Sequence, residues 1–146
     1  MYRKVLIPLD GSELAECALP EVMNLAGGGV VGEVVLLNVV DIPSLWVAEG
    51  LDIMKLKDAL LEKAQEYLSD VQSRLSKEGL NVSDVVMEGK TAQTIIDYSR
   101  EKAVDLIVLA THGYTGMKQL MFGSVALRVL HDARVPVLLI RPESCR

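Results

Sequence analysis

The stretch Val34-Val35-Leu36-Leu37-Asn38-Val39-Val40-Asp41 is the clearest indication of the fold in this chain. Its apolar residues run almost continuously instead of alternating with polar ones, so both faces of the segment are expected to be buried. Strands covered on both faces are typical of parallel sheets that carry helices on either side. The segment therefore predicts a central strand of an α/β fold.

Four further short apolar runs share the valine, leucine and isoleucine content of this segment. They span residues 5–7, 82–87, 106–110 and 135–140. The segments between the runs carry apolar residues at helical spacing, most clearly from Leu56 to Leu75. The order β-α-β-α-β-α-β-α-β, with right-handed crossovers, predicts a doubly wound parallel sheet of five strands.

Length and composition predict one domain that spans residues 1–146. Of the 146 residues, 50% are hydrophobic and 24% are charged, and a chain of this size can bury a core without metals or disulfides. The net charge of −5 disfavours a nucleic-acid-binding surface, which needs a basic face. The chain has no apolar run of membrane-spanning length, and its first apolar run is too short for a signal peptide. We therefore expect a cytoplasmic protein without membrane contact.

The two cysteines agree with that expectation. Cys17 lies in a predicted helix and Cys145 in the tail, and neither belongs to a CxxC pair or to a cluster with zinc-ligand spacing. We expect Cys17 to be a small core residue and Cys145 to be a free thiol, as in a reducing compartment.

Candidate ligand-binding residues follow the first and second runs, because doubly wound sheets bind ligands beyond the carboxyl ends of their strands. Pro8, Leu9 and Asp10 follow the first run. The Asp10 carboxylate can accept hydrogen bonds from an amine or a hydroxyl, or it can cap the first helix jointly with Ser12. Val39 is apolar, so its contribution would be a backbone N–H and C=O aimed at a flat base.

A second candidate group follows the fourth run. Ala110-Thr111-His112-Gly113 is followed by nine residues and then by Gly123-Ser124. Gly123 lets the backbone approach a ligand, and Ser124 is expected to open the last helix, where unpaired amides favour an anion. His112 would add positive charge near a phosphate. Ordinary turn and capping chemistry explains Gly123-Ser124 equally well when that pair is taken alone.

At these residues the chain resembles the universal stress protein family over nearly its whole length. The resemblance is carried by Ile7-Pro8-Leu9-Asp10-Gly11-Ser12, by Leu36-Leu37-Asn38-Val39-Val40-Asp41, and by the segment that runs from Ala110 through Gly123-Ser124 to Ile140. The ATP-binding branch carries a glycine, two residues, a glycine, nine residues, and then glycine with serine or threonine. Gly113, Gly123 and Ser124 match that pattern, whereas Ala110 replaces the first glycine. The resemblance implies a Rossmann-like, adenine nucleotide alpha hydrolase-like fold with strand order 3-2-1-4-5.

The resemblance also implies a site for ATP or another adenine nucleotide, with or without a magnesium ion. Asp10 and the backbone of Val39 would contact adenine, while the base and ribose would be lined by Pro8, Leu9, Leu109 and Ala110. The phosphates would be held by His112, Gly113, Gly123, Ser124 and the N–H of Val125. Alanine at position 110 fits if the backbone there is β-like and is strained if the position needs a positive φ.

The family resemblance further implies a homodimer. In the family the last strand, which here runs from Val135 to Ile140, lies at the sheet edge and pairs with its copy in a second subunit. An apolar edge strand is an aggregation risk unless it is paired. We expect a stress-response protein that also has a regulatory protein partner, which the sequence does not identify.

Three alternatives remain open. A slow ATP hydrolase would use Asp10 and His112, but the chain lacks a GxxxxGK[ST] loop and a Ser-Gly-Gly-x-Asp-Ser loop, so we expect a weak ATPase at most. A phosphorelay receiver domain is disfavoured because Asp10 has no acidic neighbour before it and Glu88-Gly89-Lys90 follows the third strand. A structural dimer without ligand is the serious alternative, favoured by Ala110 and disfavoured by the intact glycines.

Overall fold

The computed structural model describes residues 1–42, 52–111 and 120–141, and the structural statements below refer to these residues. Five strands form one sheet in the order β3-β2-β1-β4-β5, and every neighbouring pair is parallel. The strands are β1 (Tyr2–Pro8), β2 (Val31–Val40), β3 (Asn81–Glu88), β4 (Leu106–Ala110) and β5 (Val137–Ile140). The predicted fold class and strand order are confirmed.

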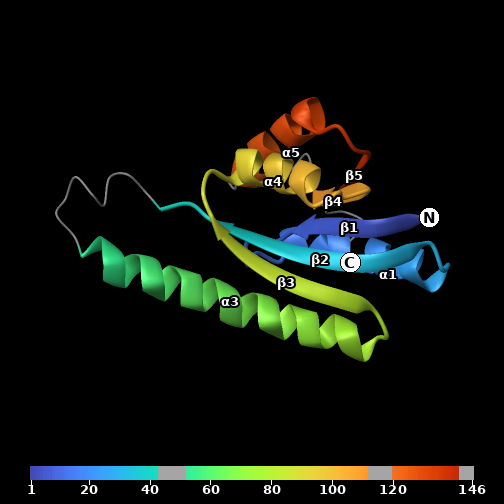
Figure 1. The fold of residues 1–146 in the computed structure, drawn as a ribbon, viewed down its shortest axis with the longest axis horizontal. Helices are drawn as coiled ribbons and strands as arrows, with labels where there is room; N and C mark the ends of the chain where they lie inside the picture. Colours follow the sequence, from blue (N-terminus) through green and yellow to red (C-terminus); the bar gives the residue numbers. More distant parts are fainter. Residues whose placement is uncertain (43–51, 112–119, 142–146) are drawn as a thin grey trace.

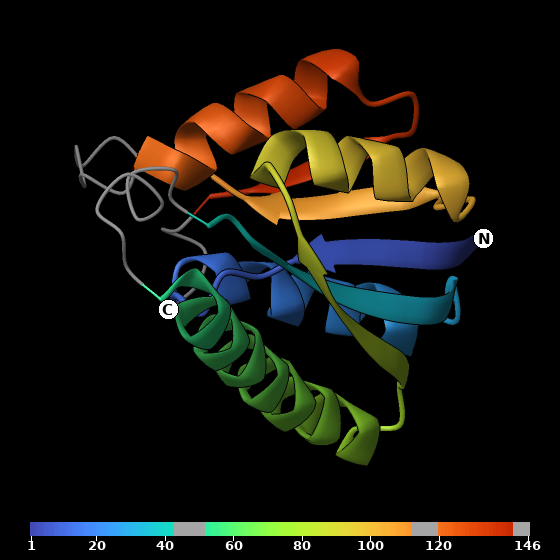
Figure 2. The ribbon, with the colours of Figure 1, turned by 60° about the vertical axis from the view of Figure 1, so that its left-hand side comes forward.

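Helices cover both faces of this sheet. One face carries α1 (Leu19–Gly27) and α3 (Ile53–Lys77), and the other carries α4 (Thr91–Glu101) and α5 (Leu120–Asp132) (Figure 1, Figure 2). All five residues of β4 and the segment 34–38 of β2 are buried. Burial on both faces is the physical reason that these strands read as continuous apolar runs.

The first helical segment differs from the expected single helix. A 3₁₀ turn, η1 (Ala15–Ala18), comes first, and α1 begins only at Leu19, with Pro20 in its first turn. Proline is suited to that place, because the first N–H groups of a helix have no partner within the helix. Ser12 therefore lies ahead of η1 and not at the start of α1, where Ala18 is the N-cap without a side-chain hydrogen bond.

The last strand is shorter than predicted and does lie at the sheet edge, beside β4. Its observed bounds are Val137–Ile140, whereas the apolar run begins at Val135. Pro136 has no N–H for the ladder, although its carbonyl oxygen accepts from Ile107 N at 3.0 Å. Pairing of this strand with a second copy stays a prediction.

Cys17 requires a correction. Its side chain is buried, as expected, with 7% of its surface exposed, but it is disulfide-bonded and is not a thiol. Cys145 lies outside the described residues. The expectation of a reducing compartment therefore loses the support that two unbonded cysteines would have given it. Among the described residues, no helix is both long enough and apolar enough to cross a membrane.

Candidate functional site

The seam between β1 and β4 is closed at one end and open at the other. At the amino end, Asp105 N donates to Lys4 O and Asp105 Oδ2 accepts from Lys4 N, both at 2.9 Å. The pairing of the two strands ends at Leu6 and Ile107, although β1 continues to Pro8 and β4 to Ala110. The strands separate toward their carboxyl ends, where the winding direction of the sheet reverses. A parallel sheet binds ligands at such a point.

Asp10 lies at this opening, and one of its oxygens is already engaged. Asp10 Oδ1 accepts from Ser12 N at 2.9 Å and from Ser12 Oγ at 2.6 Å, while Ser12 Oγ accepts from Ala15 N at 3.1 Å. The two side chains thus hold the start of η1 together, which is the joint capping role considered above. No described residue donates a hydrogen bond to the other oxygen, Oδ2, so the exposed carboxylate can accept from a ligand as well.

Val39 presents its backbone toward the same opening. Leu37 O accepts from Leu9 N at 2.8 Å, so the peptide groups of Leu37 face β1. Backbone direction alternates along a strand, which turns the N–H and C=O of Val39 to the same side, beyond the last residue of β1. No backbone hydrogen bond joins them to Leu9 or Asp10. An adjacent donor and acceptor therefore lie beyond the end of β1, and their contact with a base stays a prediction.

Five of the candidate residues meet around one small cavity. Its lining includes Pro8, Leu9, Asp10, Val39 and Val125. The cavity has a volume of about 20 Å³, which is enough for a water molecule and too little for a nucleotide base. A ligand at this site would therefore lie against the rim, in the opening between β1 and β4.

Leu109 and Ala110 end β4 and form the opposite wall of that opening. Both side chains are fully buried. Ala103 is the one non-glycine residue in the described part of the chain with a positive φ, so Ala110 has ordinary strand geometry. The condition for strain at position 110 is not met, and alanine fits there.

The last helix corrects the expected position of Gly123 and Ser124. Helix α5 begins at Leu120, which makes Gly123 its fourth residue and Ser124 its fifth. The unpaired N–H groups of a helix belong to its first turn, so the Ser124 amide lies within the helical ladder and not at its start. Glycine is a weak helix former, which is why the sequence suggested a boundary there. His112 and Gly113 lie outside the described residues.

Three further residues near the opening were not singled out by the sequence. Thr91 and Ile95 of α4 line the small cavity together with Leu37 of β2, and only the tertiary packing of α4 on β2 brings Thr91 and Ile95 there. Asn38 is 8% exposed, and its side-chain amide has no hydrogen bond to a described residue. Buried amides usually have a partner, so a polar residue inside an apolar run is the sequence feature that could have indicated this position.

Two ion pairs lie near the carboxyl ends of β2 and β3, one made by Lys90 after β3 and one by Lys57 of α3. Lys90 Nζ lies 3.3 Å from Asp41 Oδ1, and Lys57 Nζ lies 2.7 Å from Glu88 Oε2. The hydrogen bond to Glu88 and its negative charge raise the pKa of Lys57. Lys90 therefore pairs with the end of β2, as a loop lysine. Within the described residues, no group of three or more His, Cys, Asp or Glu side chains could hold a metal ion.

Comparison with known proteins gives a consistent result over the chain. The family model described as "Universal stress protein family" matches residues 1–141. Universal stress protein MJ0531 of Methanocaldococcus jannaschii is 32% identical over 142 residues, which cover 97% of this chain and 83% of that protein.

Solved structures of similar proteins match this chain over nearly its whole length. The structure of protein MJ0577 of the same organism has a TM-score of 0.79 at 32% identity and covers 97% of this chain and 96% of its own. Universal stress protein UspA from Lactobacillus plantarum has a TM-score of 0.78 at 26% identity, with 96% and 98% covered.

Two more distant structures contain adenine nucleotides. A universal stress protein in complex with cAMP has a TM-score of 0.67 at 17% identity, with 97% of this chain and 98% of that chain covered. A family protein from Arabidopsis thaliana with AMP bound has a TM-score of 0.69 at 15% identity, with 95% and 91% covered. At such identities the likeness shows the fold alone. The family match over residues 1–141, together with the relatives above 30% identity, shows that this chain belongs to the universal stress protein family.

Proposed function

We propose that this protein binds an adenine nucleotide in the opening between β1 and β4 and acts as a nucleotide-dependent regulatory protein of the stress response. The observation that carries the proposal is the backbone of Val39, whose N–H and C=O face the opening beyond the end of β1. Family structures with cAMP and with AMP support the choice of ligand.

The donor and acceptor of Val39 suit adenine in particular. The N6 amino group of adenine donates to a carbonyl oxygen, and the neighbouring N1 accepts from an N–H. Guanine carries an acceptor and a donor in the opposite order, so it would place like groups against each other. Asp10 Oδ2 would accept from the adenine amine or from a ribose hydroxyl, and Pro8, Leu9, Leu109 and Ala110 would contact the base and the sugar.

The phosphates would extend toward α5. Gly123 lies in the first turns of that helix and Val125 lines the cavity beside Asp10, so a phosphate chain that starts at the ribose can reach both. The N-terminal end of a helix favours negative charge. We assign Ser124, His112 and Gly113 to the same phosphate group, and we expect magnesium, where it binds, to be held mainly by the phosphates.

Calorimetric titration of the nucleotide-stripped protein tests the proposal. ATP, ADP and AMP would be titrated with and without Mg²⁺, and GTP would test the base preference. We expect micromolar binding of at least one adenine nucleotide and much weaker binding of GTP. Absence of binding to all three adenine nucleotides would contradict the proposal and favour the ligand-free structural dimer.

A matched pair of glycine variants locates the site. Gly123→Val places a side chain where the phosphates would pass and is expected to abolish binding. Gly27→Val is the control, because it ends α1 and has no atom within 4 Å of an added Cβ. Equal affinity in both variants would contradict the assignment of Gly123.

We further propose a homodimer through the edge strand β5, and a single domain over residues 1–146. The support for the dimer is the edge position of a short apolar strand whose residues are only half-buried. Sedimentation at working concentration is expected to give a dimer, and a monomer would contradict this. A regulatory role also predicts slow ATP turnover, and a rate of about 1 s⁻¹ or more, typical of enzymes, would argue for a hydrolase.

A further inference from the structure

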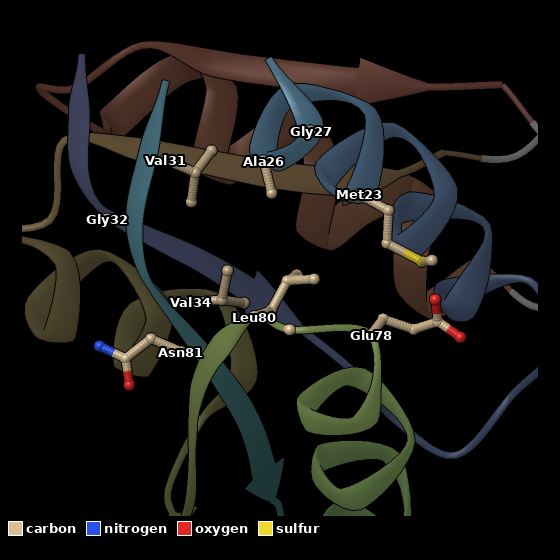
Figure 3. A pocket seen from close by; sticks show the side chains of 10 residues that line it. Met23, Ala26, Gly27, Val31, Gly32, Val34, Glu78, Leu80 and Asn81 are labelled. Carbon is tan, nitrogen blue, oxygen red and sulfur yellow. The ribbon is translucent and has the colours of Figure 1, made fainter. Parts of the chain in front are cut away.

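A second hollow lies at the amino ends of the strands, at the other end of the sheet from the nucleotide opening (Figure 3). Its volume is about 340 Å³, which is within the range of small-molecule sites. Apolar side chains line it from α1, from β2 and from the turn after α3: Met23, Ala26, Val31, Val34 and Leu80. None of these residues belongs to the nucleotide site described above.

The hollow exists because the chain places glycines where α1 and α3 end. Helix α1 ends at Gly27, and Gly79 follows the end of α3 with a φ of 90°. Neither has an atom within 4 Å of an added Cβ, so no side chain fills the space between the two helix ends. At the floor, a Cβ on Gly32 would lie 2.7 Å from Arg3 O, which shows how closely β1 and β2 approach there.

Glu78 gives this hollow its charge. It is the one ionisable side chain among the lining residues, it is exposed, and it makes no ion pair or hydrogen bond to a described residue. It is also the C-cap of α3, where the helix dipole already disfavours negative charge. At the C-terminal end of α1, the carbonyl groups of Asn24, Leu25 and Ala26 already accept from Gly28, Val30 and Gly29. Lys77, the preceding residue, does not line the hollow.

A carboxylate at a helix C-terminus breaks a local electrostatic preference, and a cation at the same place would restore it. Figure 3 shows Met23 and Glu78 projecting from α1 and from the end of α3 at one side of the hollow, with Leu80 and Val34 farther toward β2. An occupant that satisfies both features needs a positive group for Glu78 and a hydrocarbon body for the apolar wall.

We propose that this hollow binds a small organic cation, namely an ammonium or guanidinium group carried on an aliphatic chain. The charged group pairs with the Glu78 carboxylate, and the chain packs on Met23, Val34 and Leu80. A free aliphatic amine and a lysine or arginine side chain of another protein present the same chemistry.

An ion pair next to this hollow, between η1 and α3, shows how a guanidinium group and a carboxylate pair in this part of the molecule. Met23 and Glu78 also line an adjoining hollow of about 280 Å³ between α1 and α3. At its border, Arg74 Nη2 lies 2.8 Å from Glu16 Oε1, so a guanidinium from α3 already pairs with a carboxylate from η1 there. Glu78 offers a second carboxylate between α1 and α3, and no guanidinium or ammonium group of a described residue pairs with it.

Titration followed by two-dimensional ¹H–¹⁵N NMR tests the proposal on the intact protein. Hexylammonium is the probe, and hexanol and hexanoate are controls of equal chain length without positive charge. A peptide with one lysine between two leucines, acetylated and amidated, represents a protein side chain. We expect hexylammonium or the peptide to shift the amides of Gly27, Gly32 and Leu80, and the stronger of the two identifies the source.

Glu78→Gln is expected to weaken binding of the cation about five-fold, in line with about 1 kcal/mol for an exposed ion pair. Glu101→Gln, which changes an exposed acid in the last turn of α4, is the matched control and should leave affinity unchanged. Ala26→Leu should fill the hollow and abolish the shifts. Equal binding of hexanol, equal affinity in Glu78→Gln, or absence of shifts with both cations would overturn the proposal.

Discussion

The two ends of the sheet differ in how they form a concave site. At the carboxyl end, β1 and β4 separate, and the chain places polar groups of Asp10, Ser12 and Val39 at the opening. At the amino end, Lys4 and Asp105 tie the same strands together, and the concave space lies instead between α1 and α3, where glycines omit side chains. The first site is formed by polar groups at particular positions, whereas the second is formed by glycines that leave space unfilled. Only the first can be recognised as a sequence motif.

Removal of the Asp10 carboxylate is expected to have the largest effect and to act on the carboxyl end alone. Asp10→Ala should weaken adenine nucleotide binding by about 2 kcal/mol, because a charged acceptor is lost, and should lower stability by a smaller amount through the lost turn at Ser12. Calorimetry measures the affinity. Asp41→Asn, which changes an exposed carboxylate at the end of β2, should leave affinity intact; equal losses in both would show that general charge is responsible.

Gly32→Ala is expected to damage the amino end without affecting nucleotide binding. The added Cβ would lie 2.7 Å from Arg3 O, and the strand backbones must shift, at a cost of about 2 kcal/mol of unfolding free energy. Denaturant unfolding measures the loss. A matching loss of nucleotide affinity would show that the two ends are coupled, and would break the contrast drawn above.

Tyr67 links α3 to η1 through a hydrogen bond to Glu16, and its ionisation should lower the free energy of unfolding at alkaline pH. Its hydroxyl donates to Glu16 Oε2 at 2.9 Å, and burial, followed by that hydrogen bond, raises the pKa of Tyr67. A raised pKa stabilises the fold fully below about pH 10, the ordinary value, and this contribution is lost as pH rises further. Tyr67→Phe should cost about 1 kcal/mol at neutral pH and should flatten the decline above pH 10. A parallel decline in both proteins would contradict the assignment.

Two alanine-to-glycine changes, one at each end of the sheet, give the smallest effects and opposite signs. Ala103 follows α4 with a φ of 52°, where glycine is preferred, so Ala103→Gly should stabilise the protein by about 0.5–1 kcal/mol. Ala110→Gly removes a buried methyl group from β4 and should destabilise it by about 1 kcal/mol, with nucleotide affinity equal or better. Thermal unfolding and calorimetry check both. A large loss of affinity in Ala110→Gly would contradict the described role of β4.

The sequence predicted the elements best where burial alone decides them. The bounds of β4 agree to the residue, and the strands β1 to β3 extend the predicted apolar cores by a few residues. The predicted helix boundaries were wrong where a single residue was taken to mark the start of a helix. Gly123 suggested the start of α5, but the helix already begins at Leu120. Ser12 suggested the start of the first helix, but a 3₁₀ turn comes first and α1 begins at Leu19, next to Pro20.

Site prediction followed the same division. Asp10 and Val39 could be proposed from the sequence because Asp10 follows β1 and Val39 lies at the carboxyl end of β2, and apolar runs mark where strands end. Thr91, Ile95 and the hollow around Glu78 could not be predicted from the sequence. Their neighbours belong to other helices and strands, and how the helices pack decides which residues meet. The binding roles assigned to all of these residues stay predictions, and His112 and Gly113 also lie outside the described residues.

The short pairing of β1 with β4 divides the sheet into two parts, β3-β2-β1 and β4-β5. Two residue pairs join them, whereas β2 and β3 are paired over eight. Local opening should begin along this line, and exchange of amide hydrogens at Leu106 and Ile107 would report it. A nucleotide that contacts Val39 on one part and α5 on the other acts as a removable cross-link between them. Its binding would then be measured as slower amide exchange at Leu106 and Ile107, where β1 and β4 are still paired and which lie before the opening that holds the ligand.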